Sequence, residues 1–331
     1  MNDKNKLLEI ERLSVRYIVN NVVVEAVTDL SLDVEEGEYV GLVGETGAGK
    51  TTTALAAMGL IPDPPGKITS GFIRFEGEDL LRKTPKQMRT IRGSSISMIF
   101  QDPMTSLNPV INIGDQIMEV ILLHNKISKG EATLKAQKML EMVGISANRY
   151  PEFPHQFSGG MKQRVMIACA LACNPKLLIA DEPTTALDVT IQAQILELIE
   201  NLKKEFNTAM LMITHDLGVV SEVCDRVAVM YAGNIVEQGS VSAVYQNPAH
   251  PYTVGLFNSL PDLDEDTERL KPIPGMMPDP SNLPKGCSFA PRCSFCSRQC
   301  EEEQPDTVEA EPGHKIACFN FRRLLTALEG R

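Results

Sequence analysis

The sequence predicts an α/β fold with a mixed, mainly parallel sheet, a helical subdomain and a small Cys-rich C-terminal domain. Short apolar strands alternate with helix-patterned segments, an order typical of helices packed on a parallel sheet. A Gly-rich run joins one such strand directly to a helix, and five of the 8 Cys lie between Cys287 and Cys318. We therefore expect a main domain over residues 1–255, with the helical subdomain at about 102–160, and a Pro- and Cys-rich extension over 256–331.

The first 80 residues are rich in strand and turn signals. β-branched and aromatic residues predict strands, and the pair Asn20-Asn21 predicts a turn between the first two. The strands are expected at Leu7–Tyr17, Val22–Leu32, Glu38–Val43 and Gly71–Phe75. A helix is expected over Thr51–Leu60, ended by the prolines that begin at Pro62.

The middle of the chain carries helical periodicity and then buried strands. Apolar residues recur at helical spacing through residues 110–150, which predicts the helical subdomain. Further helices are expected at Met161–Cys173 and Ile191–Lys204, and strands at Leu177–Ala180, Ala209–Thr214 and Arg226–Tyr231. The first of these strands is apolar throughout, as is usual for a strand covered on both faces.

Composition and charge exclude several classes of protein. The 331 residues are 43% hydrophobic and 23% charged, as in ordinary globular domains. A net charge of −11 makes duplex DNA a poor partner, because neutralising phosphates requires clustered Lys and Arg. The longest apolar run, Val165–Cys173, has nine residues, whereas a membrane-spanning helix needs about 20. Because the start of the chain also lacks an apolar signal core, we expect a soluble, intracellular protein whose Cys are thiols or metal ligands.

A phosphate-binding loop follows the strand that ends at Val43. Its pattern, G-x4-G-K-[ST], is complete in Gly44, Glu45, Thr46, Gly47, Ala48, Gly49, Lys50 and Thr51, with Thr52 next. Glycines let backbone N–H groups converge on a phosphate, and the positive end of the following helix points at the anion. Lys50 would contact the β- and γ-phosphate oxygens, and the Thr51 hydroxyl would bind Mg²⁺. A strand is expected before this motif and a helix after it, which is the structural context in which the motif binds phosphate.

A pair of acids ends the apolar strand at residues 177–180. Asp181 would lie at the carboxyl edge of the sheet, where a carboxylate can hold Mg²⁺ through water. Glu182 would orient or deprotonate an attacking water. An isolated Asp-Glu pair is more often a solvated strand end, so this interpretation depends on the phosphate loop.

A second helix start with anion-binding character precedes the acidic strand. Ser158, Gly159 and Gly160 combine a hydroxyl, free N–H groups and a helix dipole. With this order of motifs, residues 7–250 resemble the ATP-binding-cassette (ABC) ATPases. Further positions similar to that family are the Q-loop glutamine Gln101, the D-loop Ala186-Leu187-Asp188, the switch histidine His215 and the aromatic base platform Tyr17. Stacking on Tyr17 tolerates any base, so GTP remains an alternative to ATP.

The resemblance implies a two-subunit mechanism. Two ATPase subunits would face each other head to tail, with Ser158 of one covering the γ-phosphate bound by Lys50 of the other. Gln101 would join Thr51 and Asp181 at Mg²⁺ and report the nucleotide state to a membrane partner. His215 would contact the γ-phosphate and help Glu182 hold the water.

Two C-terminal features resemble the dipeptide and oligopeptide import branch of that family, which also contains nickel importers. They are His250-Pro251-Tyr252-Thr253 and the segment Gly286–Cys293, with Cys300 and Cys318 beyond it. The branch implies two transmembrane permease subunits, a second and often non-identical ATPase, and an extracytoplasmic peptide-binding protein. It places the chain at the cytoplasmic face of the cell membrane, and residues 102–109 are expected to line the groove for a permease helix.

The Cys cluster admits three interpretations. Cys287, Cys293, Cys300 and Cys318 are spaced x5, x6 and x17 and match the branch pattern, whereas Cys296 is extra. Four thiolates suit Zn²⁺ or an iron–sulfur cluster, but structural zinc sites favour close Cys pairs. The wide spacing favours [4Fe–4S] over Zn²⁺, and unligated thiols are the third possibility.

Two other functions fit the sequence less well than an import ATPase. A non-transport ABC ATPase acting on nucleic acid is disfavoured by the single cassette and the acidic charge. A purely Cys-ligated redox module is disfavoured by the complete ATPase motifs. Substrate identity, peptide or nickel, is set by other chains.

Overall fold

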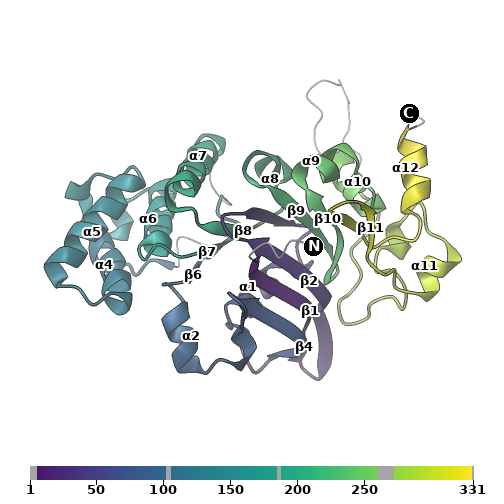
Figure 1. Cartoon of the computed structure of the whole chain (residues 1–331), viewed down its shortest axis with the longest axis horizontal. Helices are drawn as coiled ribbons and strands as arrows, with labels where there is room; N and C mark the ends of the chain where they lie inside the picture. The colour runs from purple at the N-terminus through teal and green to yellow at the C-terminus, as the bar shows by residue number, and fades with distance from the viewer. Residues whose placement is uncertain (1–5, 102–105, 185–187, 260–271, 330–331) are drawn as a thin grey trace. The chain divides into compact units, whose positions relative to one another are not determined.

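The computed structural model describes residues 6–101, 106–184, 188–259 and 272–329 (Figure 1). Contacts within the chain divide it into two compact units. The first comprises residues 1–9, 33–39 and 74–214, and the second comprises 10–32, 40–73 and 215–331. Among the described residues, no helix has both the length and the apolar character needed to cross a membrane.

A four-stranded sheet has the order β2-β1-β4-β5. Its strands are β1 (Lys6–Val19), β2 (Val22–Glu35), β4 (Gly66–Phe75) and β5 (Glu78–Asp79). Asn20 and Asn21 turn the chain from β1 to β2 with φ of 50° and 63°. Asn tolerates this left-handed region better than most residues, and two such residues form the tight turn that fits a twisted hairpin.

The second unit contains a five-strand run in the order β11-β12-β10-β9-β3. These strands are β3 (Tyr39–Val43), β9 (Arg226–Tyr231), β10 (Asn234–Ser240), β11 (Val308–Glu311) and β12 (His314–Ile316). β3 is parallel to β9, and the remaining pairs are antiparallel, which confirms a mixed sheet. The sequence analysis predicted no strand beyond Tyr231, yet the Cys-rich extension contributes β12, which pairs Ile316 with Glu237 of β10.

The helices of the second unit are short. They are α1 (Lys50–Ala57), α8 (Leu217–Val223), α9 (Val241–Gln246), α10 (Pro251–Asn258), α11 (Arg298–Glu302) and α12 (Phe321–Glu329). The predicted helix at Thr51–Leu60 is therefore correct in place but ends earlier, with Met58 as its C-cap. Gly59 adopts a φ of 60° and stops the helix before the prolines are reached.

The first unit contains three parallel strands in the order β8-β7-β6. They are β6 (Ile96–Ile99), β7 (Leu177–Asp181) and β8 (Ala209–Thr214), and every residue in them is buried. The main helices are α2 (Pro85–Ile91), α4 (Ile113–His124), α5 (Lys129–Met142), α6 (Gly159–Leu171) and α7 (Val189–Phe206). Burial on both faces explains why the strands carry continuous apolar runs rather than alternation.

The predicted helical region at 110–150 consists of two helices, α4 and α5, which lie side by side (Figure 1) and also contact α6. Gly114 makes room on α4 for the ring of Tyr150, because a Cβ at that position would lie 2.2 Å from the ring. The Tyr150 hydroxyl donates to Asp115 at 2.9 Å. Burial, together with that carboxylate, raises the pKa of Tyr150 to about 12, so the hydroxyl stays a hydrogen-bond donor at neutral pH.

Candidate functional site

The predicted phosphate loop leaves β3 at a sharply turned glycine. Gly44, Gly47 and Gly49 have φ of 154°, 85° and 107°. A Cβ at Gly44 would lie 2.1 Å from the carbonyl oxygen of Met230, and one at Gly49 would lie 2.3 Å from that of Ala26. At these two positions the backbone can follow its path only without a side chain.

Lys50 and the start of α1 supply positive character to this loop. Lys50 is only 6% exposed, and its Nζ donates to the carbonyl oxygens of Gly44 at 2.7 Å and Glu45 at 3.1 Å. The N-cap of α1 is Gly49, which has no side chain of its own to cap the helix start, and a helix start without such a cap favours an anion. The Thr51 hydroxyl lies on an exposed residue and is available to a cation. This donor set fits the phosphates of a nucleotide and an associated Mg²⁺.

The other predicted residues of this loop differ in exposure. Ala48 is buried, Glu45 and Thr52 are half-buried, and Thr46 and Gly47 are exposed. The Ala48 N–H donates to the Glu45 carbonyl at 3.1 Å, and the Ala48 carbonyl accepts from Gly233 at 2.9 Å. The loop is thus closed on itself and tied to the turn after β9.

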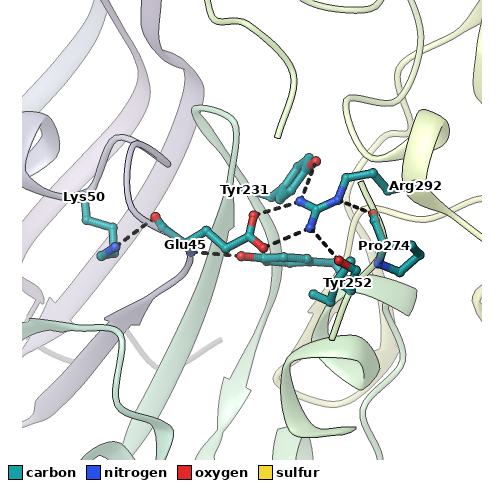
Figure 2. A network of polar contacts seen from close by, with 7 residues as sticks. Glu45, Lys50, Tyr231, Tyr252, Pro274 and Arg292 are labelled. Carbon is teal, nitrogen blue, oxygen red and sulfur yellow. Dashed lines mark hydrogen bonds and ion pairs between the residues drawn. The ribbon is translucent and has the colours of Figure 1, made fainter. Parts of the chain in front are cut away.

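Arg292 and Tyr252, both from the chain beyond residue 250, hold Glu45, and Tyr231 at the end of β9 contacts Arg292 (Figure 2). The Arg292 guanidinium donates to both Glu45 carboxylate oxygens, at 2.8 and 3.0 Å. It also donates to the Tyr231 hydroxyl at 3.3 Å and to the Pro274 carbonyl at 3.0 Å. The Tyr252 hydroxyl accepts the main-chain N–H of Glu45 at 2.9 Å. Hydrogen bonding to Glu45 raises the pKa of Arg292, so this cation is permanent.

In the first unit, the acidic end of β7 is built as predicted. Asp181 is 2% exposed, and Glu182 follows it with a φ of 49°, a conformation uncommon for a residue with a side chain. The Glu182 N–H donates to the Ile213 carbonyl at 2.8 Å, which fixes this backbone. Gln101 Nε2 donates to Glu182 Oε2 at 2.9 Å, so the structure brings these two predicted residues together.

The Ser158 turn is open where the phosphate loop is closed. Ser158 and Gly159 are exposed, and the Ser158 Oγ accepts the Met161 N–H at 3.4 Å. A Cβ at Gly160 would lie 2.4 Å from Ile191, so α6 and α7 approach closely at this point. Gln163, one turn further along α6, donates to the Pro183 carbonyl at 2.7 Å and links this helix to the acidic strand end.

The remaining predicted residues lie at element ends. Asp188 caps α7 by accepting the Ile191 N–H at 3.0 Å, and its D-loop neighbours Ala186 and Leu187 fall outside the described residues. His215 directly follows β8 in sequence and is exposed. Tyr17 is half-buried, and a Cβ at Gly66 would lie 2.7 Å from its ring. Residues 102–105 of the expected permease groove also fall outside the described residues.

The four predicted cysteines gather around one small cavity in the second unit. Cys287, Cys293, Cys300 and Cys318 line it, together with Phe289 and other residues, whereas the extra Cys296 does not. None of the eight Cys forms a disulfide. Burial raises the pKa of Cys293 to about 11 and that of Cys318 to about 12. Over the described residues, no group of three or more His, Cys, Asp or Glu is arranged to hold a metal ion, so the arrangement of the side chains does not by itself show a site for either predicted metal.

The sequence analysis missed the residues that support the phosphate loop. Arg292 and Tyr252 lie inside the two C-terminal segments already singled out, but they received no role. The sequence did carry one signal, the basic residue Arg292 inside a Pro- and Cys-rich segment, because an arginine that becomes buried there needs an acidic or polar partner. That partner, Glu45, lies 247 residues away, a distance that no local pattern can bridge.

Two family models match the chain. The model described as ABC transporter matches residues 27–185. The model described as oligopeptide/dipeptide transporter, C-terminal region, matches residues 236–300. The second match includes Tyr252, Arg292 and three of the four cavity cysteines.

Similar curated proteins cover nearly the whole chain. The oligopeptide transport ATP-binding protein AppD of Bacillus subtilis is 50% identical over 317 residues, 95% of this chain and 97% of that protein. The oligopeptide transport ATP-binding protein OppD of Salmonella typhimurium is 50% identical over 95% of this chain and 94% of its own length. The dipeptide transport ATP-binding protein DppD of Bacillus subtilis is 48% identical over 95% and 94%.

Solved structures share the cassette fold. The dimeric ATP-binding cassette MJ0796 bound to ADP and Pi has a TM-score of 0.64 at 25% identity, covering 71% of this chain and 98% of that one. The cassette cbiO1 of Clostridium perfringens, part of an ABC transporter complex, has a TM-score of 0.64 at 27% identity, covering 76% and 95%.

Proposed function

The chain belongs to the ATP-binding subunits of ABC oligopeptide and dipeptide transporters, and on that premise we propose that it hydrolyses ATP to drive peptide import. The observation that carries the proposal is the complete order of ATPase motifs inside a chain about half identical to such subunits over 95% of its length. ATP is bound between two head-to-tail ATPase subunits. The dimeric cassette with ADP and Pi, to which this fold is similar, supports that arrangement.

Nucleotide binding is assigned to the phosphate loop. Backbone N–H groups of residues 44–52 surround the phosphates, and Lys50 exchanges its two carbonyl acceptors for phosphate oxygens. Tyr17 stacks on the base. Thr51, Asp181 and Gln101 are the proposed ligands of Mg²⁺, which when bound neutralises part of the phosphate charge.

Hydrolysis is assigned to the end of β7 and to a neighbouring subunit. Glu182 orients and deprotonates the attacking water, and Gln101 holds its carboxylate. His215 contacts the γ-phosphate. Ser158, Gly159 and Gly160 of the second subunit donate to the same phosphate, and Asp188 lies at the subunit boundary. Either chain alone lacks part of the donors around the developing charge, so turnover requires both.

Glu182→Gln tests the assignment. The amide keeps the size and one hydrogen-bond acceptor but cannot take a proton, so ATP binding should persist while turnover falls by about 10²–10⁴-fold. The variant should also accumulate as an ATP-bound dimer, alone or with its partner ATPase, in size-exclusion chromatography with light scattering. Turnover near the wild-type rate would refute the role of Glu182. An ATP-loaded variant that stayed monomeric even with its partner would refute the shared site.

The partners are proposed from the family. They are two transmembrane permeases, a second ATPase that is a paralogue, and an extracytoplasmic peptide-binding protein, with this chain peripheral on the cytoplasmic face of the membrane. Residues 1–255 are the cassette, with its helical subdomain at about 102–160, and 256–331 are the extension. ATP-dependent uptake of labelled peptide by the reconstituted complex tests this assignment, and nickel uptake instead would support the alternative substrate.

We also propose that the cysteine cavity holds a [4Fe–4S] cluster, with Zn²⁺ as the alternative. The support is that four thiols from separate segments line one cavity, while Cys296 stays outside it. The sulfur ligands would come from Cys287, Cys293, Cys300 and Cys318. Iron, sulfide and zinc analysis of anaerobically purified protein decides between the two. Protein that contains neither metal would leave the residues as unligated thiols and refute both.

A further inference from the structure

Arg292 of the Cys-rich segment contacts Glu45 of the phosphate loop, and the proposed function gives this contact no role. The Arg292 side chain is 5% exposed and forms two parallel hydrogen bonds with the Glu45 carboxylate (Figure 2). Its other N–H groups donate to Tyr231, Pro274 and Ile273. A buried guanidinium with this many acceptors holds one geometry, and a bidentate pair fixes the carboxylate in direction as well as distance.

Glu45 is held at three points, each by a different group. Its carboxylate binds Arg292, its N–H donates to the Tyr252 hydroxyl, and its carbonyl accepts from Lys50 Nζ at 3.1 Å. Lys50, the residue that would contact phosphate, is thus already hydrogen-bonded to the main chain of Glu45, whose side chain carries a negative charge. Without Arg292, the Glu45 carboxylate could turn to Lys50.

A released carboxylate would weaken nucleotide binding in two ways. It would neutralise Lys50, the cation that the loop offers to phosphate. It would also place a negative charge beside a ligand that is itself strongly negative, and such repulsion is strong in a partly buried site. Arg292 prevents both effects by holding the Glu45 carboxylate in a fixed ion pair.

We infer that Arg292 is a positioning residue for ATP binding: it holds Glu45 away from Lys50 and thereby makes ATP affinity depend on the Cys-rich segment. This inference rests on the proposed function, because it assumes that the loop binds ATP. Aromatic packing joins the same two regions. The ring of Phe289, in the Cys-rich segment, lies 5.2 Å from that of Tyr231 and 5.4 Å from that of Tyr252, and Phe289 also lines the cysteine cavity.

The test uses the full chain and measures the Kd for Mg-ATP by calorimetry, together with kcat and KM of the assembled ATPase. Arg292→Met should raise Kd and KM about tenfold, with a smaller change in kcat, because the lost charge acts on ground-state binding. Adding Glu45→Gln to Arg292→Met should restore most of the affinity, because the freed side chain then carries no charge. Arg292→Lys should lie between, since one ammonium cannot reproduce two parallel bonds.

The matched control is Arg298→Met, which removes an exposed arginine, 87% accessible and paired with Glu302, from the same segment. It should leave Kd unchanged. A Kd for Arg292→Met equal to that of the control, or no recovery in the double variant, would overturn the inference. If Arg292→Met does not fold, Arg292→Lys with and without Glu45→Gln gives the same comparison. A wild-type chain that binds no ATP would refute the proposed function instead.

Discussion

Two predicted anion-binding turns, the phosphate loop and the Ser158 turn, each place glycines at the start of a helix, and they are built in opposite ways. The phosphate loop before α1 is enclosed: Gly44 and Lys50 are buried, and Glu45 is bonded to three other side chains. The Ser158 turn before α6 is open: Ser158 and Gly159 are exposed, and a Cβ at Gly159 would meet nothing within 4 Å. Both turns present N–H groups suited to an anion.

This difference matches what each turn must do in a shared site. A loop that binds its own nucleotide gains affinity when its geometry is fixed before the ligand arrives, since less ordering is lost on binding. A turn that closes on the nucleotide of another subunit must instead be accessible from outside. We therefore expect changes in the enclosed phosphate loop to lower ATP affinity, and changes in the exposed Ser158 turn to lower turnover.

Alanine at the two turns tests the difference most strongly. In Gly49→Ala, the new Cβ would lie 2.3 Å from the Ala26 carbonyl, on a backbone with a φ of 107°. The loop cannot keep its path, so ATP affinity should fall on the order of 100-fold or more, about 3 kcal/mol. In Gly159→Ala, the Cβ enters open space, so the ATP affinity of the isolated chain should not change. Calorimetry on both variants gives the comparison.

Circular dichroism, with thermal melting, serves as the control for this pair of variants. The lost affinity of Gly49→Ala is informative only if the variant remains folded, which retained secondary structure and a cooperative melting curve would show. Equal ATP affinities for the two variants would mean that enclosure of the loop does not govern binding.

Ser158→Arg tests the exposed turn by itself. The arginine side chain has room on the solvent side. It lacks the Ser158 hydroxyl, and its bulk blocks the approach of a second subunit. Turnover should fall by about 10²–10³-fold, the usual effect of losing one charge-stabilising donor, while the Kd for ATP of the isolated chain stays unchanged. Steady-state ATPase assays of the assembled pair and calorimetry of the single chain separate the two quantities. A parallel loss of both would place Ser158 in the nucleotide site of its own chain.

The enclosed loop could be predicted from sequence only in part. The pattern from Gly44 to Thr51 predicts where the backbone turns sharply, because glycine tolerates positive φ and close approach of other backbone. The buried strands β3, β7 and β8 were also predictable, because continuous apolar runs of that length favour covered strands. β6, α2 and α8 were not predicted: each is seven residues or fewer, too short for a periodic signal to emerge.

The support of the loop could not be predicted, because it depends on contacts distant in sequence. Tyr252 and Glu45 are 207 residues apart, and Arg292 and Glu45 are 247 apart. Both contacts belong to a tertiary arrangement in which β9 pairs with β3 and the extension adds β12 to β10. The strands of the extension were missed for a related reason: β12 has three residues and gains its stability from pairing with β10.

Acid should have a smaller effect, on the stability of the region that supports the enclosed loop, through the histidine that caps α10. His250 is buried, and its Nδ1 accepts the Tyr252 N–H at 3.0 Å. The main-chain N–H of His250 donates to Glu237, which also pairs with His314. Burial lowers the pKa of His250 from 6.5 to about 3, so the folded chain holds it neutral.

Between these two pKa values the unfolded chain binds a proton that the folded chain does not, so stability is complete above about pH 6.5 and falls as pH decreases toward 3. The limiting slope for one such group is about 1.4 kcal/mol per pH unit, which for a domain of this size shifts Tm by about 2–4 °C per kcal/mol. His250→Asn keeps a side-chain cap for α10 but cannot titrate. Melting curves from pH 7.5 down to pH 5 should therefore fall less steeply for the variant than for the wild type, and identical slopes would show that His250 does not govern this loss. Because the folded chain keeps His250 neutral down to about pH 3, the ATP affinity of the folded protein should not change between pH 7.5 and pH 5, and only the unfolding transition should move.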